Sequence, residues 1–314
     1  MRQLLLTRLL SVAPMLLLVS LFAFLLIHLT ATDPVVQILG EGASAEDRAE
    51  FARKLGLDRP LVEQYLRWAW AAMQGDFGTS LYTSLPVGQS ILERLGITLS
   101  LALSGMAFAL CVGVPLGILG SLRHGSRADR LLTMIVSLGL AVPSIWLALL
   151  LSLAFAVNLR WFQVIGYTPF TDDPLQWARS LVLPSIALGV HAAAVIARQT
   201  RSAMIEALHS RYVQALRARG IPPRLIVLRY AARNAMVPVL SVIAIQMSVI
   251  VGVSFVIERI FALPGLGTLL IDSVVRADFP ILQGCVVVIA CLVLVVNLVV
   301  DIAYGLVNPK VIAQ

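Results

Sequence analysis

The sequence has few charged residues. Only 13% of its 314 residues are Asp, Glu, Lys or Arg, whereas 59% are hydrophobic and the mean hydropathy is +0.90. Soluble domains carry about 25% charged residues, so a water-soluble fold of this length could not cover its surface. The shortage excludes a soluble class and predicts an all-α, polytopic protein embedded in a lipid bilayer.

Lysine is scarcest of all. Only Lys54 and Lys310 occur, and they follow Arg53 and Pro309. A loop that cradles nucleotide phosphates requires a Gly-Lys pair in the pattern GxxxxGK[ST]. Its absence excludes ATP hydrolysis by such a loop, so we expect no catalytic residue and no cofactor bound by the chain itself.

Cysteine and histidine are also few and form no ligand pattern. The three cysteines all lie in apolar runs, which is typical of small buried hydrophobic residues (Cys111, Cys285, Cys291). The four histidines are scattered, and we expect no metal site. The net charge of +7 comes from basic residues beside apolar runs, which indicates membrane topology and argues against nucleic-acid binding.

Long apolar runs dominate what is present. A membrane-spanning helix needs about 20 apolar residues, and the chain has six such runs. They cover about Leu9–Leu29, Gly96–Ser121, Leu131–Val157, Leu181–Ala197, Ala235–Ile257 and Gly284–Val307. Basic residues precede the first run, lie within the 122–130 loop and the 198–234 loop, and follow the sixth run at Lys310. The segment from Asp33 to Arg94 instead holds nine acids and six bases. Basic residues stay on the cytoplasmic side, so both termini are predicted to be cytoplasmic.

The 33–95 segment is therefore predicted to face outward. It contains two helical patterns, the first capped by Ser44 and ended by Gly56, and then a short amphipathic helix that leads into the membrane. It could be a lid, a docking surface or a packed hairpin without a partner. A second outward segment, 258–283, has a turn at Pro264, Gly265 and Gly267 before a re-entrant or interfacial helix.

Polar residues inside the six runs are few, and the runs contain no Lys or Glu. Candidates for lining a transport path are Pro143 and Ser144 in the third run and Gln246, Ser248 and Ser254 in the fifth. His191, Asn297 and Asp301 are further polar positions in the fourth and sixth runs.

The loop from Arg198 to Pro238 carries eight arginines and one acid, Glu206. Gly220 predicts the end of one short helix, and Pro222 and Pro223 predict the start of another. The first helix places Tyr212, Val213 and Leu216 among arginines. This composition is typical of a protein interface, and equally of an amphipathic helix that lies on anionic lipid.

The loop resembles the signature loop of ABC-importer permeases. Gln214, Ala215 and Leu216 stand in the position of its EAA-type triplet, followed by Gly220, Ile226 and Pro238. The acidic first residue of the triplet is missing. The stretches GDFGTSL, PVGQSILERL, VPSIWLALLL, ERIFALPGLG and RADFPILQG also resemble, in the same order, dipeptide/oligopeptide/nickel permeases of the first-subunit type. The resemblance covers essentially the whole chain.

The resemblance implies a type I ABC-importer permease with six transmembrane helices in the bacterial inner membrane. Its parts would be an N-terminal helix (1–30), an extracytoplasmic docking segment (31–95), a transmembrane domain (96–306) with a coupling loop (198–235), and a cytoplasmic tail (307–314). Its partners would be a second permease, two ATPase subunits that hold ATP and Mg²⁺, and an extracytoplasmic binding protein. The expected ATPase contacts are Tyr212, Val213, Leu216, Arg217, Arg219 and Gly220. Pro264, Gly265 and Gly267 would face the binding protein.

The substrate remains open at this point. Peptides form the largest class of substrate in the family, and nickel or other metal chelates, opines and glutathione are alternatives. Two other classes of function compete. An ion-coupled secondary transporter would be expected to have carboxylates at the membrane midplane or broken helices in paired repeats. A scaffold or receptor without transport would use the central loop only as a binding site.

Overall fold

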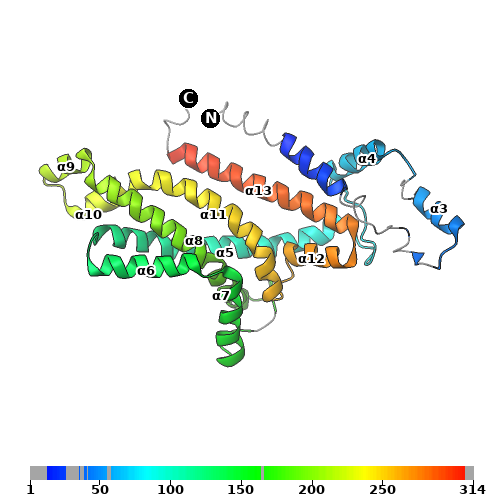
Figure 1. Ribbon diagram of the computed structural model, residues 1–314, viewed down its shortest axis with the longest axis horizontal. Helices are drawn as coiled ribbons and strands as arrows, with labels where there is room; N and C mark the ends of the chain where they lie inside the picture. Colours follow the sequence, from blue (N-terminus) through cyan, green and yellow to red (C-terminus); the bar gives the residue numbers. More distant parts are fainter. Residues whose placement is uncertain are drawn as a thin grey trace. The chain divides into compact units, whose positions relative to one another are not determined.

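The computed structural model describes residues 13–25, 35, 39–40, 42–54, 58–163 and 166–307. These residues are helical apart from turns and one isolated β-bridge between Thr79 and Pro86 (Figure 1), which confirms the all-α prediction for them. A helix covers Ala13–Leu25. The later elements are α3 (Ala45–Lys54), α4 (Leu61–Met73), α5 (Val87–Leu122), α6 (Arg127–Ala141), α7 (Ser144–Leu151), η1 (Ser152–Asn158), α8 (Pro174–His209), α9 (Arg211–Ala218), α10 (Pro223–Leu225), η2 (Ile226–Ala231), α11 (Ala232–Ile260), α12 (Leu266–Arg276) and α13 (Phe279–Val307).

Four of these helical segments are long and apolar enough to cross a membrane. They are Val87–Leu122, Pro174–His209, Pro223–Ile260 and Phe279–Val299, and the bent pair of α6 with α7–η1 gives up to five. The first expected run, Leu9–Leu29, is described only over Ala13–Leu25, which is shorter than a span. The predicted tail, 307–314, lies outside the described residues except for Val307.

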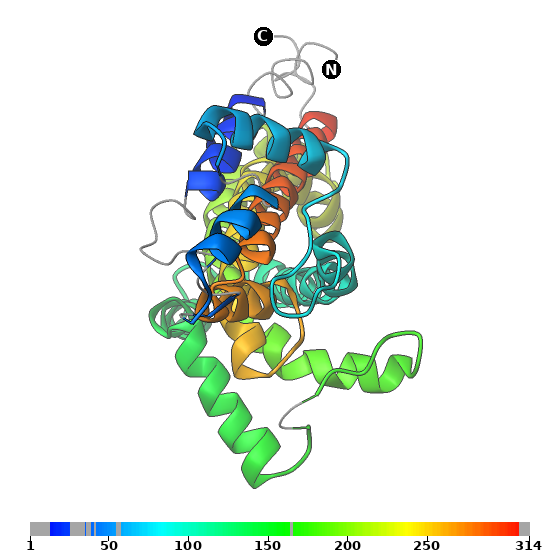
Figure 2. The ribbon, with the colours of Figure 1, turned by 90° about the vertical axis from the view of Figure 1, so that its right-hand side faces the viewer.

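The third run, Leu131–Val157, does not form one continuous helix. The helix breaks at Val142 and Pro143, and its two parts meet at an angle of 96°. Proline has no N–H to donate and disfavours helical backbone at the residue before it, and Val142 accordingly has an extended ψ of 120°. In Figures 1 and 2, α7 and η1 turn away from α6 as a separate arm.

The fourth run was predicted too short. The helix α8 begins after Asp173, whose side chain accepts hydrogen bonds from the N–H groups of Leu175 and Gln176, and it continues to His209. Pro184 lies inside it without ending it. Arg198 and Arg201, at the start of the basic loop expected over 198–235, therefore belong to this long helix.

The amphipathic helix predicted before the second run is not a separate element. The helix α5 is continuous from Val87 to Leu122. The capping prediction for Ser44 is confirmed, since its hydroxyl accepts the N–H of Asp47 at 3.1 Å. The predicted stop at Gly56 falls outside the described residues.

The helices form two compact units. Within the described residues, the large unit comprises 96–268 and 295–307, and the small unit comprises the residues up to 95 together with 269–294. In the large unit, α8 packs on α11, α6 and α7, and its buried face consists mainly of alanine and leucine.

Small residues allow α5 to approach α8 closely within the large unit. A Cβ on Gly117 would lie 2.5 Å from the Cβ of Thr200, and one on Gly113 would lie 2.6 Å from the carbonyl oxygen of Ala193. Contacts of this kind support helix association in membranes, where lipid tails remove the usual hydrophobic drive.

The small unit is held by polar and aromatic contacts of its own. The hydroxyl of Ser80 donates to the carboxylate of Asp278, which also accepts the N–H of Leu81. The rings of Phe24, Tyr65 and Trp68 pack together with centroids 5.5–6.3 Å apart. Residues of the 33–95 segment are thus tied to the segment that joins α12 to α13.

Candidate functional site

The arginine-rich loop folds as a capped elbow, which we define as residues 210–231. The hydroxyl of Ser210 accepts the N–H of Val213 at the start of α9. Gly220 has a φ of +73° and donates its N–H to the carbonyl of Arg217 at 2.9 Å. A residue with a Cβ is strained in this left-handed conformation. Pro222 and Pro223 then begin α10, so the predicted helix, sharp turn and helix are confirmed.

The inner face of the elbow is apolar and closed by the chain itself. Val213, Leu216 and Ile226 are 1%, 8% and 2% exposed and pack with Ile221 and Tyr230. Val213 and Leu216 were expected as contacts for a partner, but the structure uses their side chains to hold α9 against η2. This packing gives a helix of only eight residues a fixed position.

The outer face is basic and exposed. Tyr212 is 46% exposed, and its ring lies edge-on to that of Tyr230 with centroids 6.1 Å apart. The elbow contains five arginines and no acid, and all five are exposed (Arg211, Arg217, Arg219, Arg224, Arg229). A cavity of about 360 Å³ beside it is lined by His124, His209 and Arg217 among others. The exposed arginines and the cavity beside them suit a partner that presents acidic groups to this surface.

An ion pair fixes the helix ends next to the elbow. Arg201 on α8 donates from Nε and Nη2 to both carboxylate oxygens of Asp129, each at 2.7 Å. Asp129 is only 4% exposed and also accepts the N–H of Gly125. His124 Nδ1 lies 3.1 Å from the same guanidinium. Sequence reasoning missed this site, although Asp129 is the one acid in an otherwise basic loop.

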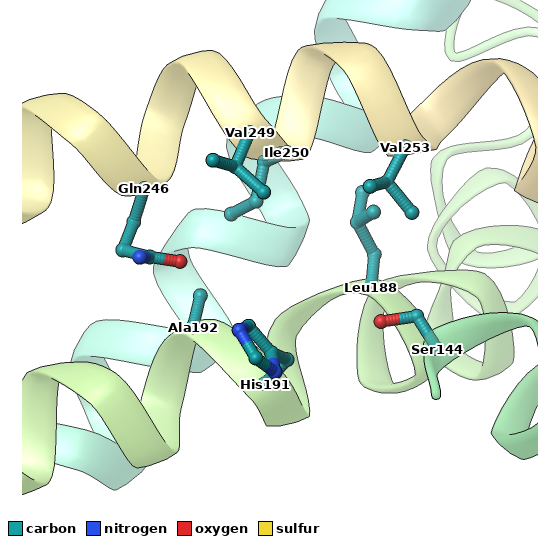
Figure 3. Close-up of a pocket in the computed structure, with 8 residues that line it drawn as sticks. All are labelled: Ser144, Leu188, His191, Ala192, Gln246, Val249, Ile250 and Val253. Atoms are coloured by element: carbon teal, nitrogen blue, oxygen red, sulfur yellow. The ribbon is translucent and has the colours of Figure 1, made fainter. Parts of the chain in front are cut away.

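The candidate path residues fall into two groups. Ser144 and Gln246 line one cavity together with His191 (Figure 3), and Pro143 begins the helix that carries Ser144. Ser248 instead donates to the side-chain oxygen of Asn297 at 2.8 Å. Ser254 is fully buried and donates to the carbonyl of Val251.

A buried carboxylate lies at the other end of α11. Glu258 is 0% exposed and accepts the hydroxyl of Thr98 at 2.6 Å and the N–H groups of Gly267 and Thr268 at 2.8 and 3.3 Å. The candidate span Pro223–Ile260 includes it. Sequence reasoning placed Glu258 directly after the fifth run, in the outward segment, and assigned it no role. The stretch ERIFALPGLG was the available signal.

The turn predicted to face a partner is mostly internal. A Cβ on Gly265 would meet the carboxylate of Glu258, and one on Gly267 would lie 2.3 Å from the Cα of Phe255. Both glycines are buried, whereas Pro264 is exposed. The glycines are thus required for packing around the carboxylate, and only Pro264 of the three presents a surface.

The structure offers little metal chemistry. No three His, Cys, Asp or Glu side chains of the described residues gather closely enough to hold a metal ion. Of the cysteines expected to be buried, Cys285 is buried, Cys291 is half-buried and Cys111 is exposed on α5.

The chain matches one transport family over most of its length. The family profile described as "Binding-protein-dependent transport system inner membrane component" covers residues 113–313, and the profile of its N-terminal part covers residues 1–102. A protein of Brucella abortus (strain 2308), named as a peptide transport system permease, is 40% identical over 99% of both chains. The dipeptide transport system permease protein DppB of Escherichia coli (strain K12) is 36% identical, again over 99% of both chains.

A solved structure supports the fold. A chain of the inward-facing MetNI methionine ABC transporter superposes with a TM-score of 0.58 at 22% sequence identity. The superposition covers 69% of this chain and 96% of that one.

Proposed function

The chain belongs to the family of binding-protein-dependent transport system inner membrane components, and from this premise we propose that it forms half of the path by which an ATP-driven importer moves di- or oligopeptides. As a member of this family it is a non-enzymatic permease subunit of the inner membrane. Peptide is the substrate class in the names of its full-length relatives. Nickel, metal chelates, opines and glutathione are the alternatives that the experiment below distinguishes.

The proposed topology has six spans with both termini in the cytoplasm. Five come from the helices and the bent pair described above, and Ala13–Leu25 would be the central part of the sixth. The arginines of the elbow set the orientation, because basic residues beside spans stay on the cytoplasmic side.

The elbow is the proposed point of contact with an ATPase subunit. One observation carries this proposal: an eight-residue helix is capped, packed from within by Val213 and Leu216, and presents its arginines and Tyr212 on its exposed face. Arg217, Arg219 and the turn at Gly220 are then available to the partner. ATP and Mg²⁺ would be held by that partner.

Because the elbow continues α8 and leads through η2 into α11, its displacement would be transmitted directly to both helices. The ion pair of Asp129 with Arg201 would carry the same displacement to α6. ATP binding would thus move helices that line the path, and hydrolysis would reset them.

The outward surfaces are proposed to receive the binding protein. The 33–95 segment and the exposed Pro264 are the parts assigned to it, while Gly265 and Gly267 support the turn from within. In the path itself we retain Ser144 and Gln246, with Pro143 as the break that orients Ser144. Ser248 and Ser254 have internal hydrogen-bond partners, so their proposed part in the path is secondary.

The test is uptake by the complete complex. Both permeases and both ATPase subunits are reconstituted in proteoliposomes with the binding protein. We expect uptake of labelled dialanine that requires ATP and the binding protein and ignores proton or sodium gradients. Uptake driven by a gradient without ATP would favour a secondary transporter. ATP-driven uptake of a nickel chelate without peptide uptake would show that the substrate is the chelate, while the proposed ATP-driven import would stand.

A further inference from the structure

A small cavity lies among α7, α8 and α11 of the large unit. Its volume is about 200 Å³, and three polar side chains project into it: Ser144, His191 and Gln246 (Figure 3). Leu188 and Val253 are among the apolar residues that complete its wall. In Figure 3, His191 comes from α8 and Gln246 from α11, and the two enter the same space.

The side-chain oxygen of Gln246, Oε1, is buried and has no hydrogen-bond partner among the described residues. The Gln246 side chain is more than nine-tenths buried, with 7% of the residue exposed. A buried acceptor without a partner destabilises a protein, so the position is suited to a ligand that supplies a donor.

We propose that this cavity is one half of a subsite that holds the main chain of a peptide during its passage. The inference rests on the proposed function and adds to it how the substrate is recognised. A carboxamide offers one acceptor and two donors, so Gln246 can accept a peptide N–H through Oε1 and donate to the adjoining carbonyl through Nε2. His191 and Ser144 add further polar groups to the wall of the cavity.

The composition of the cavity favours the peptide main chain over side chains as the group recognised. None of the residues that line it is a carboxylate or an arginine. Every peptide carries the same N–H and C=O groups, so recognition through them admits many side chains. Ligand sites usually measure about 300–1,000 Å³, and this smaller cavity is accordingly only the part supplied by one permease.

The experiment pairs a change in the protein with a change in the ligand. The complete complex with its binding protein is made with wild-type chain, with Gln246→Met and with Gln176→Leu as the control near the start of α8. Uptake of dialanine is compared with uptake of its ester analogue, alanyl-lactate, which lacks the peptide N–H. The binding protein is the same throughout, so its own preference cancels between variants.

We expect the wild-type chain and Gln176→Leu to favour dialanine by the same factor. Gln246→Met should reduce that factor about tenfold, as the loss of one hydrogen bond of about 1–1.5 kcal/mol predicts. His191→Leu should lower uptake of both ligands alike. Should Gln246→Met fail to assemble, Gln246→Leu serves the same comparison.

An unchanged preference in both Gln246 variants overturns the subsite while leaving peptide import intact. A wild-type complex that hydrolyses ATP and imports neither ligand overturns the proposed substrate and the subsite together. The two failures are therefore distinguishable from one set of vesicles.

Discussion

The two ends of the helical stretch Pro223–Ile260, which contains α11, differ in whether their charged residues are exposed or buried. At the elbow end, five arginines are exposed and have no acid within the elbow. At the other end, Glu258 is fully buried, and a hydroxyl and two backbone N–H groups donate to its carboxylate. Buried charge is tolerated only when it is well hydrogen-bonded, whereas exposed charge remains available to another molecule.

This difference distinguishes residues that stabilise the fold from residues that can transmit movement between subunits. The contacts of Glu258 tie α5, α11 and the start of α12 together within the large unit. The elbow has an apolar inner face that is closed and a charged outer face that is open. We therefore expect changes near Glu258 to act on stability and changes on the outer elbow to act on coupling.

The largest expected effect is at Glu258. In Glu258→Ala, the hydroxyl of Thr98 and the N–H groups of Gly267 and Thr268 lose their acceptor. We expect the free energy of unfolding to fall by about 3–5 kcal/mol, measured by thermal unfolding in detergent. Glu206→Ala, on an exposed part of α8, should change it by less than about 0.5 kcal/mol. Equal losses of stability in Glu258→Ala and Glu206→Ala would contradict the stabilising role of the contacts around Glu258.

Leu216 should have the next largest effect, because it belongs to the closed face of the elbow. Leu216→Ala leaves a cavity beside Val213 and Ile226, and we expect a local loss of about 2–4 kcal/mol. Hydrogen exchange at the amides of α9 would report it as faster exchange. Normal protection in this variant would show that the inner face does not hold the helix.

Two glycines, Gly252 in α11 and Gly267 at the start of α12, offer a further test of packing. Gly267→Ala places a Cβ 2.3 Å from the Cα of Phe255, and overpacking of this kind destabilises by about 1–3 kcal/mol. Gly252→Ala, inside α11 with no atom within 4 Å of the added Cβ, should stabilise by about 0.5–1 kcal/mol. Thermal unfolding of the two variants should therefore shift in opposite directions, and a shared direction would contradict the geometry.

Tyr212 should have the smallest effect on stability. Its ring is half exposed and contacts Tyr230 only at the edge, so Tyr212→Ala should change the free energy of unfolding by less than about 0.5 kcal/mol. Exposed aromatic residues often dominate partner binding, with about 2 kcal/mol or more at stake. Titration of the purified ATPase subunit into the wild-type and Tyr212→Ala proteins should show this loss of affinity. Unchanged affinity would show that Tyr212 is not part of the contact with the ATPase subunit.

Sequence reasoning succeeded where local chemistry decides the structure. Gly220 with the following prolines predicted the turn of the elbow, and Ser44 predicted a helix start. It failed where long-range contacts decide. A proline alone does not tell which helix breaks: Pro143 lies at the 96° break of the third run, whereas Pro184 lies inside α8 without ending it.

The same limit applies to the candidate site. The exposed residues of the elbow were predicted, but the inward direction of Val213 and Leu216 depends on Ile226 and Tyr230 across the turn. The pairing of Asp129 with Arg201 joins residues 72 positions apart, and that of Glu258 with Thr98 joins residues 160 positions apart. Apolar periodicity carries no information about such pairs.

The most direct test of the central claim is peptide uptake by a complex that carries Gly220→Pro. Proline cannot adopt the φ of +73° found at this position and has no N–H to donate to Arg217. The account predicts that the complex assembles and that ATP-driven uptake of dialanine is lost, while Gly252→Ala retains it. Uptake at the wild-type rate by the assembled Gly220→Pro complex would contradict the claim that the elbow transmits the movement.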